Sequence, residues 1–123
     1  MDPRISDAEL HVMEVLWAAT GPLTATDVAD RIEAGRGWSL ATVKTMLSRL
    51  VAKGALTHGE DGRRYVYSPA IERDSYVGGE SRRFVDRLFG GRLSPLVARL
   101  AEEDALDPDD IAAIEAILKE LKP

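Results

Sequence analysis

Cysteine is absent from this chain of 123 residues, which excludes a disulfide framework, a thiol nucleophile and a thiolate metal site. Histidine is scarce as well, because only His11 and His58 are present and they lie far apart in the sequence. Each is better explained as a surface or partly packed side chain than as a metal ligand. We therefore predict no metal site and no cofactor.

Motifs of catalysis are missing too. There is no Gly-x-Ser-x-Gly nucleophile elbow and no glycine loop for phosphate binding. The acidic cluster from Glu102 to Asp110 is better explained by helix capping and a solvated face than by hydrolysis or a divalent metal. We predict that the chain is not an enzyme.

Long apolar runs are also lacking. None approaches the roughly 18 residues that a membrane span needs. The first ten residues, MDPRISDAEL, do not have the apolar core of a signal peptide. We expect a cytoplasmic protein with no membrane partner.

The charges are unevenly distributed around a formal net charge of −5. From Arg36 to Tyr67 there are six basic residues against two acidic ones, whereas from Arg99 onward eight acidic residues face three basic ones. A basic middle and an acidic tail indicate two separate roles on one chain.

Residues 6 to 68 are predicted to form three short helices and a hairpin. Ser6 to Glu9 has the pattern of a capping box, Thr24 to Asp27 repeats it more weakly, and Ser39 can cap a third helix. Two short extended runs follow around Glu60-Asp61-Gly62, with Asp-Gly as the turn signal. This order predicts a mainly α fold with a small β wing, a winged helix-turn-helix in residues 1–70.

Residues 71–123 are predicted to form a helical dimerisation domain. One helix covers residues 73–89, a second begins with Ser94 as cap and Pro95 in the first turn, and a third begins at Asp107-Pro108. Their apolar stripes could fold back onto the winged helix or pack against a second copy. We favour the second copy, because two-fold dimers are the commonest assembly. The candidate dimerisation residues are Phe84, Leu88, Phe89, Leu96, Leu100, Ile111, Ile114 and Leu118.

The third helix carries the candidate DNA-binding face. Its apolar residues recur at i, i+3, i+4, i+7 and i+8 from Val43, so the opposite face presents hydroxyl and basic side chains. Small hydroxyl groups suit base edges in a major groove, and Lys and Arg suit phosphates. The candidate DNA-binding residues are Ser39, Thr42, Lys44, Thr45, Ser48, Arg49 and Lys53 on this helix, with Arg63 and Arg64 on the wing.

Other interpretations of this face stay open. Such residues also cover ordinary solvated helices, although three short helices followed by a basic hairpin favour DNA. The winged helix could instead be a protein-interaction module that docks an acidic partner. A regulator that senses a small ligand, and that is not inactivated by proteolysis, is a further alternative.

A spaced set of short segments runs along nearly the whole chain. The segments are Ile5-Ser6-Asp7-Ala8-Glu9, Val15-Leu16-Trp17, Trp38-Ser39, Thr42-Val43, Thr45, Arg49-Leu50, Lys53-Gly54, Gly62-Arg63, Tyr65, Tyr67-Ser68-Pro69, Glu80-Ser81 and Arg87-Leu88-Phe89-Gly90-Gly91. Through these segments the chain resembles the BlaI/MecI/CopY family of penicillinase-type repressors. The resemblance implies a homodimeric winged-helix transcriptional repressor that binds an inverted-repeat operator on double-stranded DNA. It also implies control of β-lactam resistance or a related stress response, and it places the family's recognition helix on the third helix.

The chain lacks two features that particular branches of the family have. Copper-responsive members carry cysteine pairs near the C-terminus, and copper(I) needs such soft ligands, so the chain resembles the BlaI/MecI-like branch. Penicillinase-type members are inactivated when a sensor protease cuts an Asn-Phe pair. That pair aligns with Arg99-Leu100 here, so both positions differ and cleavage by a family-type sensor protease is put in doubt.

Overall fold

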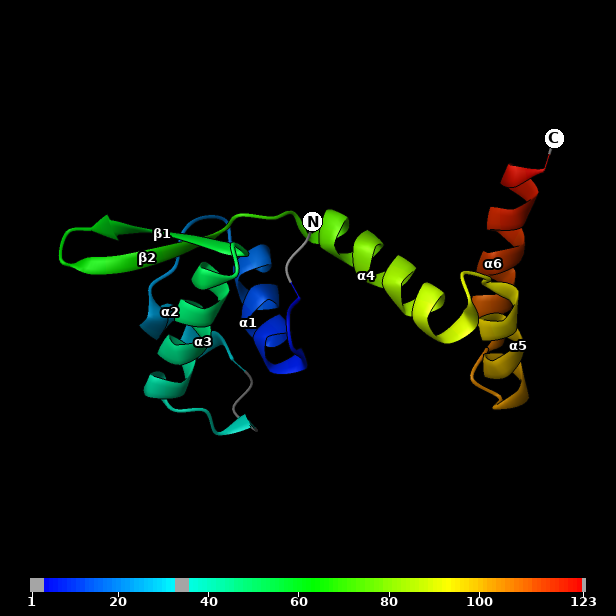
Figure 1. Cartoon of the computed structure of the whole chain (residues 1–123), viewed down its shortest axis with the longest axis horizontal. Coiled ribbons are helices and arrows are strands. Elements are labelled where there is room, and N and C mark those ends of the chain that lie inside the picture. The colour runs from blue at the N-terminus through cyan, green and yellow to red at the C-terminus, as the bar shows by residue number, and fades with distance from the viewer. Residues whose placement is uncertain (1–3, 33–35, 123) are drawn as a thin grey trace. The chain divides into compact units, whose positions relative to one another are not determined.

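The computed structural model describes residues 4–32 and 36–122 (Figure 1). It divides into two compact units, Met1–Gly79 and Glu80–Pro123, with the division inside a helix. The predicted fold class is confirmed, because the first unit is a winged helix and the second is helical. The elements are α1 (Asp7–Ala18), α2 (Ala25–Arg31), α3 (Leu40–Ala52), β1 (Leu56–Asp61), β2 (Arg64–Pro69), α4 (Arg73–Phe89), α5 (Ser94–Glu102) and α6 (Pro108–Leu121).

Most helices begin where a polar side chain can take up a free backbone N–H group. Ser6 and Thr24 each open a complete capping box, at α1 and α2. Ser39 and Asp107 cap α3 and α6 by accepting a backbone N–H from the third residue after them. The predicted caps at Ser6, Thr24 and Ser39 are confirmed, and the last helix begins at Asp107-Pro108 as predicted.

The start of α5 differs from the prediction. Ser94 is the first residue of the helix and not its cap, and Leu93 occupies the cap position without a side-chain hydrogen bond. Leu93 itself has a right-handed helical backbone, with φ −77° and ψ −36°, so the chain turns one residue earlier than expected. The Leu93 carbonyl accepts the N–H groups of Leu96 and Val97 at 3.0 and 3.2 Å.

The core of the first unit lies between α1, α2, α3 and the start of the wing. The apolar stripes of the three helices meet there, and the hairpin closes one side through a short bridge between Leu23 and Tyr67. Burial of these side chains is the main driving force for folding of this unit. The buried cluster is Val12, Met13, Leu16, Leu23, Val28, Val43, Leu47, Leu50, Ala55 and Leu56.

The wing is an antiparallel pair of strands in which Asp61 lies opposite Arg64. The two loop residues are therefore Gly62 and Arg63, which shifts the turn by one position from the predicted Asp-Gly. Gly62 has φ +68° and Arg63 is not among the residues with positive φ. This is the pattern of a type II′ turn, which needs glycine at its first central position.

The first turns of α4 belong to the first unit. The Trp17 indole N–H donates to the Ile71 carbonyl at 3.0 Å, and the Trp17 and Tyr76 rings lie 5.8 Å apart. Arg73 pairs with Glu14 at 2.7 Å, and this hydrogen bond holds the pKa of Arg73 above its ordinary value. The winged helix thus fixes the beginning of α4.

The second unit has no buried side chain on α5 or α6 among the residues described. Several of its large apolar side chains are exposed, among them Phe84 at 38% and Leu121 at 74%. Among the described residues, no helix combines the length and the apolar character that crossing a bilayer requires.

Candidate nucleic-acid interface

The faces of α3 divide as the apolar spacing predicts. Val43, Leu47 and Leu50 are fully buried. On the opposite side the helix presents exposed polar and basic side chains, and only Thr42 is half-buried. The exposed members of the predicted set on this helix are Ser39, Lys44, Thr45, Ser48, Arg49 and Lys53.

The hydroxyl groups on this face already have partners inside α3. The Ser39 hydroxyl oxygen accepts the Thr42 N–H at 3.1 Å and lies 3.0 Å from the Thr42 hydroxyl. The Thr45 hydroxyl donates to the Ala41 carbonyl at 3.0 Å. Because that proton is committed, the Thr45 oxygen remains a hydrogen-bond acceptor and its methyl group remains free to contact thymine.

A hollow of about 490 Å³ lies between the wing, α3 and the start of α2. Lys44 lines it from α3, and Arg63 and Arg64 line it from the turn and from β2. Thr26 and Tyr65, which the sequence analysis did not select, also line it. Three cations around one hollow can hold the oxygens of a backbone phosphate.

Asp27 is the acidic residue of this hollow. Hydrogen bonds from Thr24, opposed by partial burial and assisted by the charges of Arg31 and Arg64, hold the pKa of Asp27 below its ordinary value. The carboxylate accepts the Thr24 N–H at 3.1 Å and so closes the capping box of α2. Asp27 is thus committed to the cap, and the three cations still outnumber it.

Ser48 lines a smaller hollow of about 250 Å³ between α3 and the wing. Its other walls include three aromatic side chains of the wing, His58, Tyr65 and Tyr67. The His58 ring lies 5.7 Å from that of Tyr65, in an edge-on arrangement. His58 is exposed on the wing, as a surface histidine was predicted to be.

Lys53 lies apart from the other predicted cations, because its side chain turns toward α1. Its ammonium group pairs with the Glu9 carboxylate at 2.5 Å. Nothing in the sequence indicated this pair, because capping alone accounted for Glu9 and the two residues are 44 positions apart.

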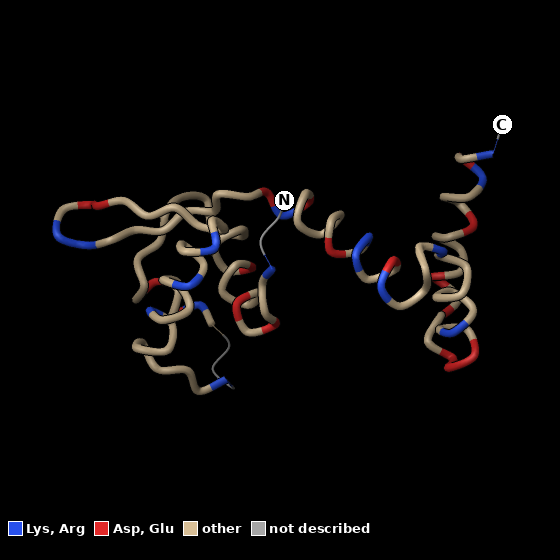
Figure 2. The backbone as a smooth tube through the Cα atoms, viewed as in Figure 1, with Lys and Arg blue, Asp and Glu red and all other residues tan. Residues whose placement is uncertain are grey.

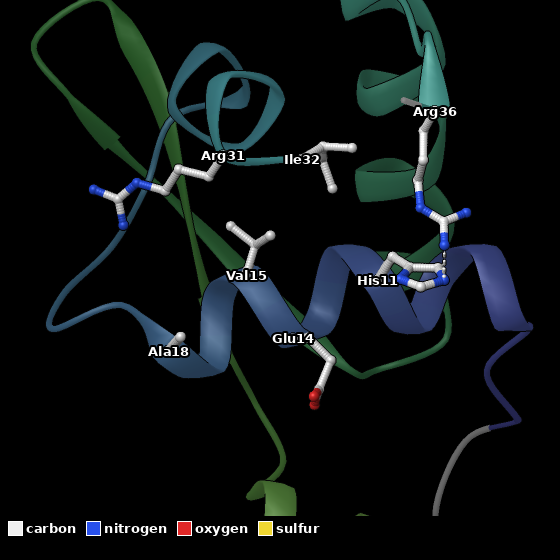
Figure 3. Close-up of a pocket in the computed structure, with 7 residues that line it drawn as sticks. All are labelled: His11, Glu14, Val15, Ala18, Arg31, Ile32 and Arg36. Atoms are coloured by element: carbon white, nitrogen blue, oxygen red, sulfur yellow. Dashed lines mark hydrogen bonds between the residues drawn. The ribbon is translucent and has the colours of Figure 1, made fainter. Parts of the chain in front are cut away.

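A second contact from α1 holds the loop before α3. The Arg36 guanidinium bonds to the His11 imidazole, as Figure 3 shows, and lies 5.4 Å from the centre of the Trp38 ring. The His11 ring meets that of Trp38 edge-on at 6.4 Å. Arg36 was counted with the basic middle of the chain, but the fold engages it next to the Ser39 cap.

His11 and Arg36 also line a pocket of about 330 Å³ with Glu14, Val15, Ala18, Arg31 and Ile32 (Figure 3). In the view of Figure 3, Arg31 points to the left, Arg36 points down toward His11, and Glu14 points down on the far side of the α1 ribbon from Arg31. The charged groups therefore do not converge on one point. Within residues 4–32 and 36–122, no group of three or more His, Asp or Glu side chains could hold a metal ion.

The candidate dimerisation residues all lie in the second unit. Phe84 and Phe89 stack with ring centres 6.2 Å apart, and Leu88 is 57% exposed. On α6, Ile111 and Leu118 are exposed and Ile114 is half-buried, while Leu96 and Leu100 are half-buried on α5. The cleavage-site equivalents Arg99 and Leu100 both lie within α5.

Comparisons with known proteins agree with this geometry. The model of the penicillinase repressor family matches residues 5–120. The penicillinase repressor of Bacillus licheniformis is 38% identical over 120 residues, covering 98% of this chain and 93% of that protein. The methicillin resistance regulatory protein MecI of Mammaliicoccus sciuri is 28% identical, covering 93% and 92%.

A solved structure shows a similar protein with DNA. It is the solution structure of the monomeric form of Bacillus licheniformis BlaI in complex with the blaP half-operator. It superposes with a TM-score of 0.53 at 42% identity, covering 62% of this chain and 92% of that chain.

Proposed function

The chain belongs to the penicillinase repressor family of DNA-binding transcriptional repressors, and from this membership we propose that it represses transcription as a homodimer on an inverted-repeat operator. In this proposal α3 enters the major groove of each half-site and the wing contacts the backbone beside it. The single observation that supports it best is the arrangement of α3, with a fully apolar buried face and a hydroxyl-bearing and basic exposed face.

The two groups of exposed side chains are proposed to do different work. Thr42, Thr45 and Ser48 are short and sit where a helix in a major groove meets base edges, so they contribute sequence preference. Lys44, Arg49, Arg63 and Arg64 contact phosphates, which contributes affinity for any sequence. The similar BlaI of Bacillus licheniformis, whose monomeric form was solved in complex with a half-operator, supports DNA as the partner of this surface.

Dimer formation is proposed from the second unit. A helical unit without a buried side chain on α5 or α6 leaves large apolar groups in water, and each would gain about 1.5–3 kcal/mol on full burial. A second copy of the same unit provides an apolar surface that can cover these side chains. Two-fold symmetry would then match two half-sites about one helical turn apart.

A selection of bound genomic fragments by the purified protein, at two salt concentrations, tests this function. We expect an inverted repeat whose half-sites lie about one helical turn apart, with the same repeat recovered at both salt concentrations. Recovery of no motif, with weak binding that disappears as salt rises, would contradict the proposal and leave only charge attraction. The role of a protein-interaction module would then become the better explanation of the exposed face of α3.

A further inference from the structure

Glu9 is an ionised group buried in the first turn of α1. Its side chain is only 4% exposed. One carboxylate oxygen, Oε1, accepts the Ser6 backbone N–H at 2.9 Å and the Lys53 ammonium group at 2.5 Å. The other oxygen, Oε2, is buried and has no hydrogen-bond partner among the described residues. All of the hydrogen bonding to this carboxylate is therefore concentrated on one oxygen.

This arrangement makes the Lys53 ammonium group the main compensation for a buried charge. Burial by itself opposes the charged form of Glu9, but the hydrogen bonds from Lys53 and Ser6 outweigh it and hold the pKa of Glu9 below its ordinary value. Removing one partner of such a pair leaves an uncompensated buried charge, which is strongly destabilising. If Lys53 left Glu9 to contact a phosphate, the Glu9 charge would lose this compensation and the fold would be destabilised.

The same pair joins two elements of the proposed DNA-binding unit. Lys53 is the C-cap residue of α3, and its backbone N–H donates to the Arg49 carbonyl at 2.9 Å. Directly after it, Gly54 takes φ +82° and the chain turns into the buried Ala55. The Lys53 side chain thus ties the end of α3 to the beginning of α1, only one helical turn beyond the exposed Arg49 and Ser48.

We propose that Glu9 and Lys53 are positioning residues, an ion-pair latch that sets the orientation of α3 against α1, and that Lys53 acts through this latch and not by contacting a DNA phosphate. The inference rests on the proposed role of α3 in the major groove. It changes the role predicted for Lys53 and gives a role in recognition to Glu9, a residue that lies outside the basic face.

The first part of the test measures the latch without DNA. Urea unfolding of the full chain is compared for Glu9→Gln, for Lys53→Met, which keeps the aliphatic stem, and for the double variant. Each single change is expected to lower the folding equilibrium constant about tenfold, and the double variant is expected to be no less stable than either single. Additive losses would overturn the latch, and this holds whether or not the protein binds DNA.

The second part measures recognition at a low temperature at which all variants are folded. The probes are the inverted-repeat fragment from the selection and a scrambled duplex of equal length. Glu9→Gln and Lys53→Met are each expected to reduce the preference for the repeat several-fold, with an unchanged slope of affinity against salt. Lys53→Arg is expected to restore the preference. Arg49→Met is the matched control, and it should lower the salt slope by about 0.9.

Three results would overturn the positioning role. One is a lower salt slope for Lys53→Met, which would make Lys53 a phosphate contact. Another is tighter binding of both duplexes by Glu9→Gln, since a released lysine would then reach DNA. The third is a destabilised Lys53→Met protein with the full preference for the repeat, which would leave the pair a purely structural role. If the unaltered protein does not prefer the repeat, the proposed function fails instead, and the unfolding cycle still decides the latch.

Discussion

The two units of this chain differ in how far their apolar side chains are buried. In the first unit, three short helices and a hairpin bury ten apolar residues in one cluster. In the second, α5 and α6 have clear apolar stripes but no buried residue within the described part of the chain. The difference shows that amphipathic helices form a core only when another apolar surface covers them.

The distribution of charge also differs between the two units. Basic residues outnumber acidic ones on α3 and the wing of the first unit, whereas acidic residues dominate the segment of α5 and α6 (Figure 2). A unit with a complete core and a basic face is suited to a polyanion, and an acidic helical segment with exposed apolar stripes is suited to another copy of itself.

The largest expected effect is in the core of the first unit. Leu47→Ala removes a fully buried side chain of α3 and is expected to lower the free energy of unfolding by about 3 kcal/mol. Leu121→Ala makes the same chemical change at a side chain that is 74% exposed, and about 0.5 kcal/mol or less is expected. Urea unfolding measures both. Equal losses would mean that the second unit has a core as complete as the first.

The next effect concerns association of the second unit. Leu118→Asp puts a charge on the apolar stripe of α6 and is expected to convert the proposed dimer to monomers by weakening association by about 3 kcal/mol. Ala112→Asp puts the same charge on the exposed polar face of α6 and should leave association unchanged. Sedimentation velocity at several concentrations distinguishes the two. A monomeric unaltered protein would contradict the role proposed for the apolar stripe.

A smaller effect on DNA binding distinguishes the hydroxyl side chains from the basic side chains on the exposed face of the first unit. Thr42→Ala and Thr45→Ala are each expected to relax sequence preference by about 1 kcal/mol, measured as affinity for the selected repeat against single-base variants. Arg63→Ala should weaken binding to every duplex and lower the salt slope by about 0.9. The assignment of roles is wrong if the threonine and arginine variants behave alike.

The smallest expected effect is the acid sensitivity of the Glu9 carboxylate. Its pKa in the folded protein lies below the ordinary value of 4.5, so its contribution to stability is complete above that pH. The contribution is lost as pH falls through the folded pKa, because the unfolded chain takes up the proton first. Stability of the unaltered protein should therefore fall more steeply below about pH 4.5 than that of Glu9→Gln. Glu120→Gln, at an exposed position of α6, should follow the unaltered protein.

Much of the fold could be predicted because its signals are local. The caps at Ser6, Thr24, Ser39 and Asp107 each involve a residue and its neighbour three positions later, so a short sequence pattern contains both partners. The prediction was wrong at Ser94, where the backbone turned helical one residue earlier. It was also wrong by one position in the wing, where pairing of the strands set the turn.

The candidate site could be predicted in part for the same reason. Helical periodicity puts Thr45, Ser48 and Arg49 opposite Val43, and the structure places them so. No local pattern reports that Thr45 donates its hydroxyl proton to Ala41, which leaves it an acceptor. The hollow shared by α3 and the wing was not foreseen either, because it needs two elements to pack together.

By itself, the sequence determined which segments are helical, which faces are apolar and where basic side chains concentrate, since these depend on residues within about one helical turn. Only the tertiary structure decided the use of each cation. Lys44, Arg63 and Arg64 meet at one hollow, Arg36 holds His11, and Lys53 holds Glu9. Packing of α2 and the wing beside α3 makes the hollow, whereas packing of α1 against α3 brings Lys53 to the Glu9 carboxylate, which needs a cation partner because it is buried.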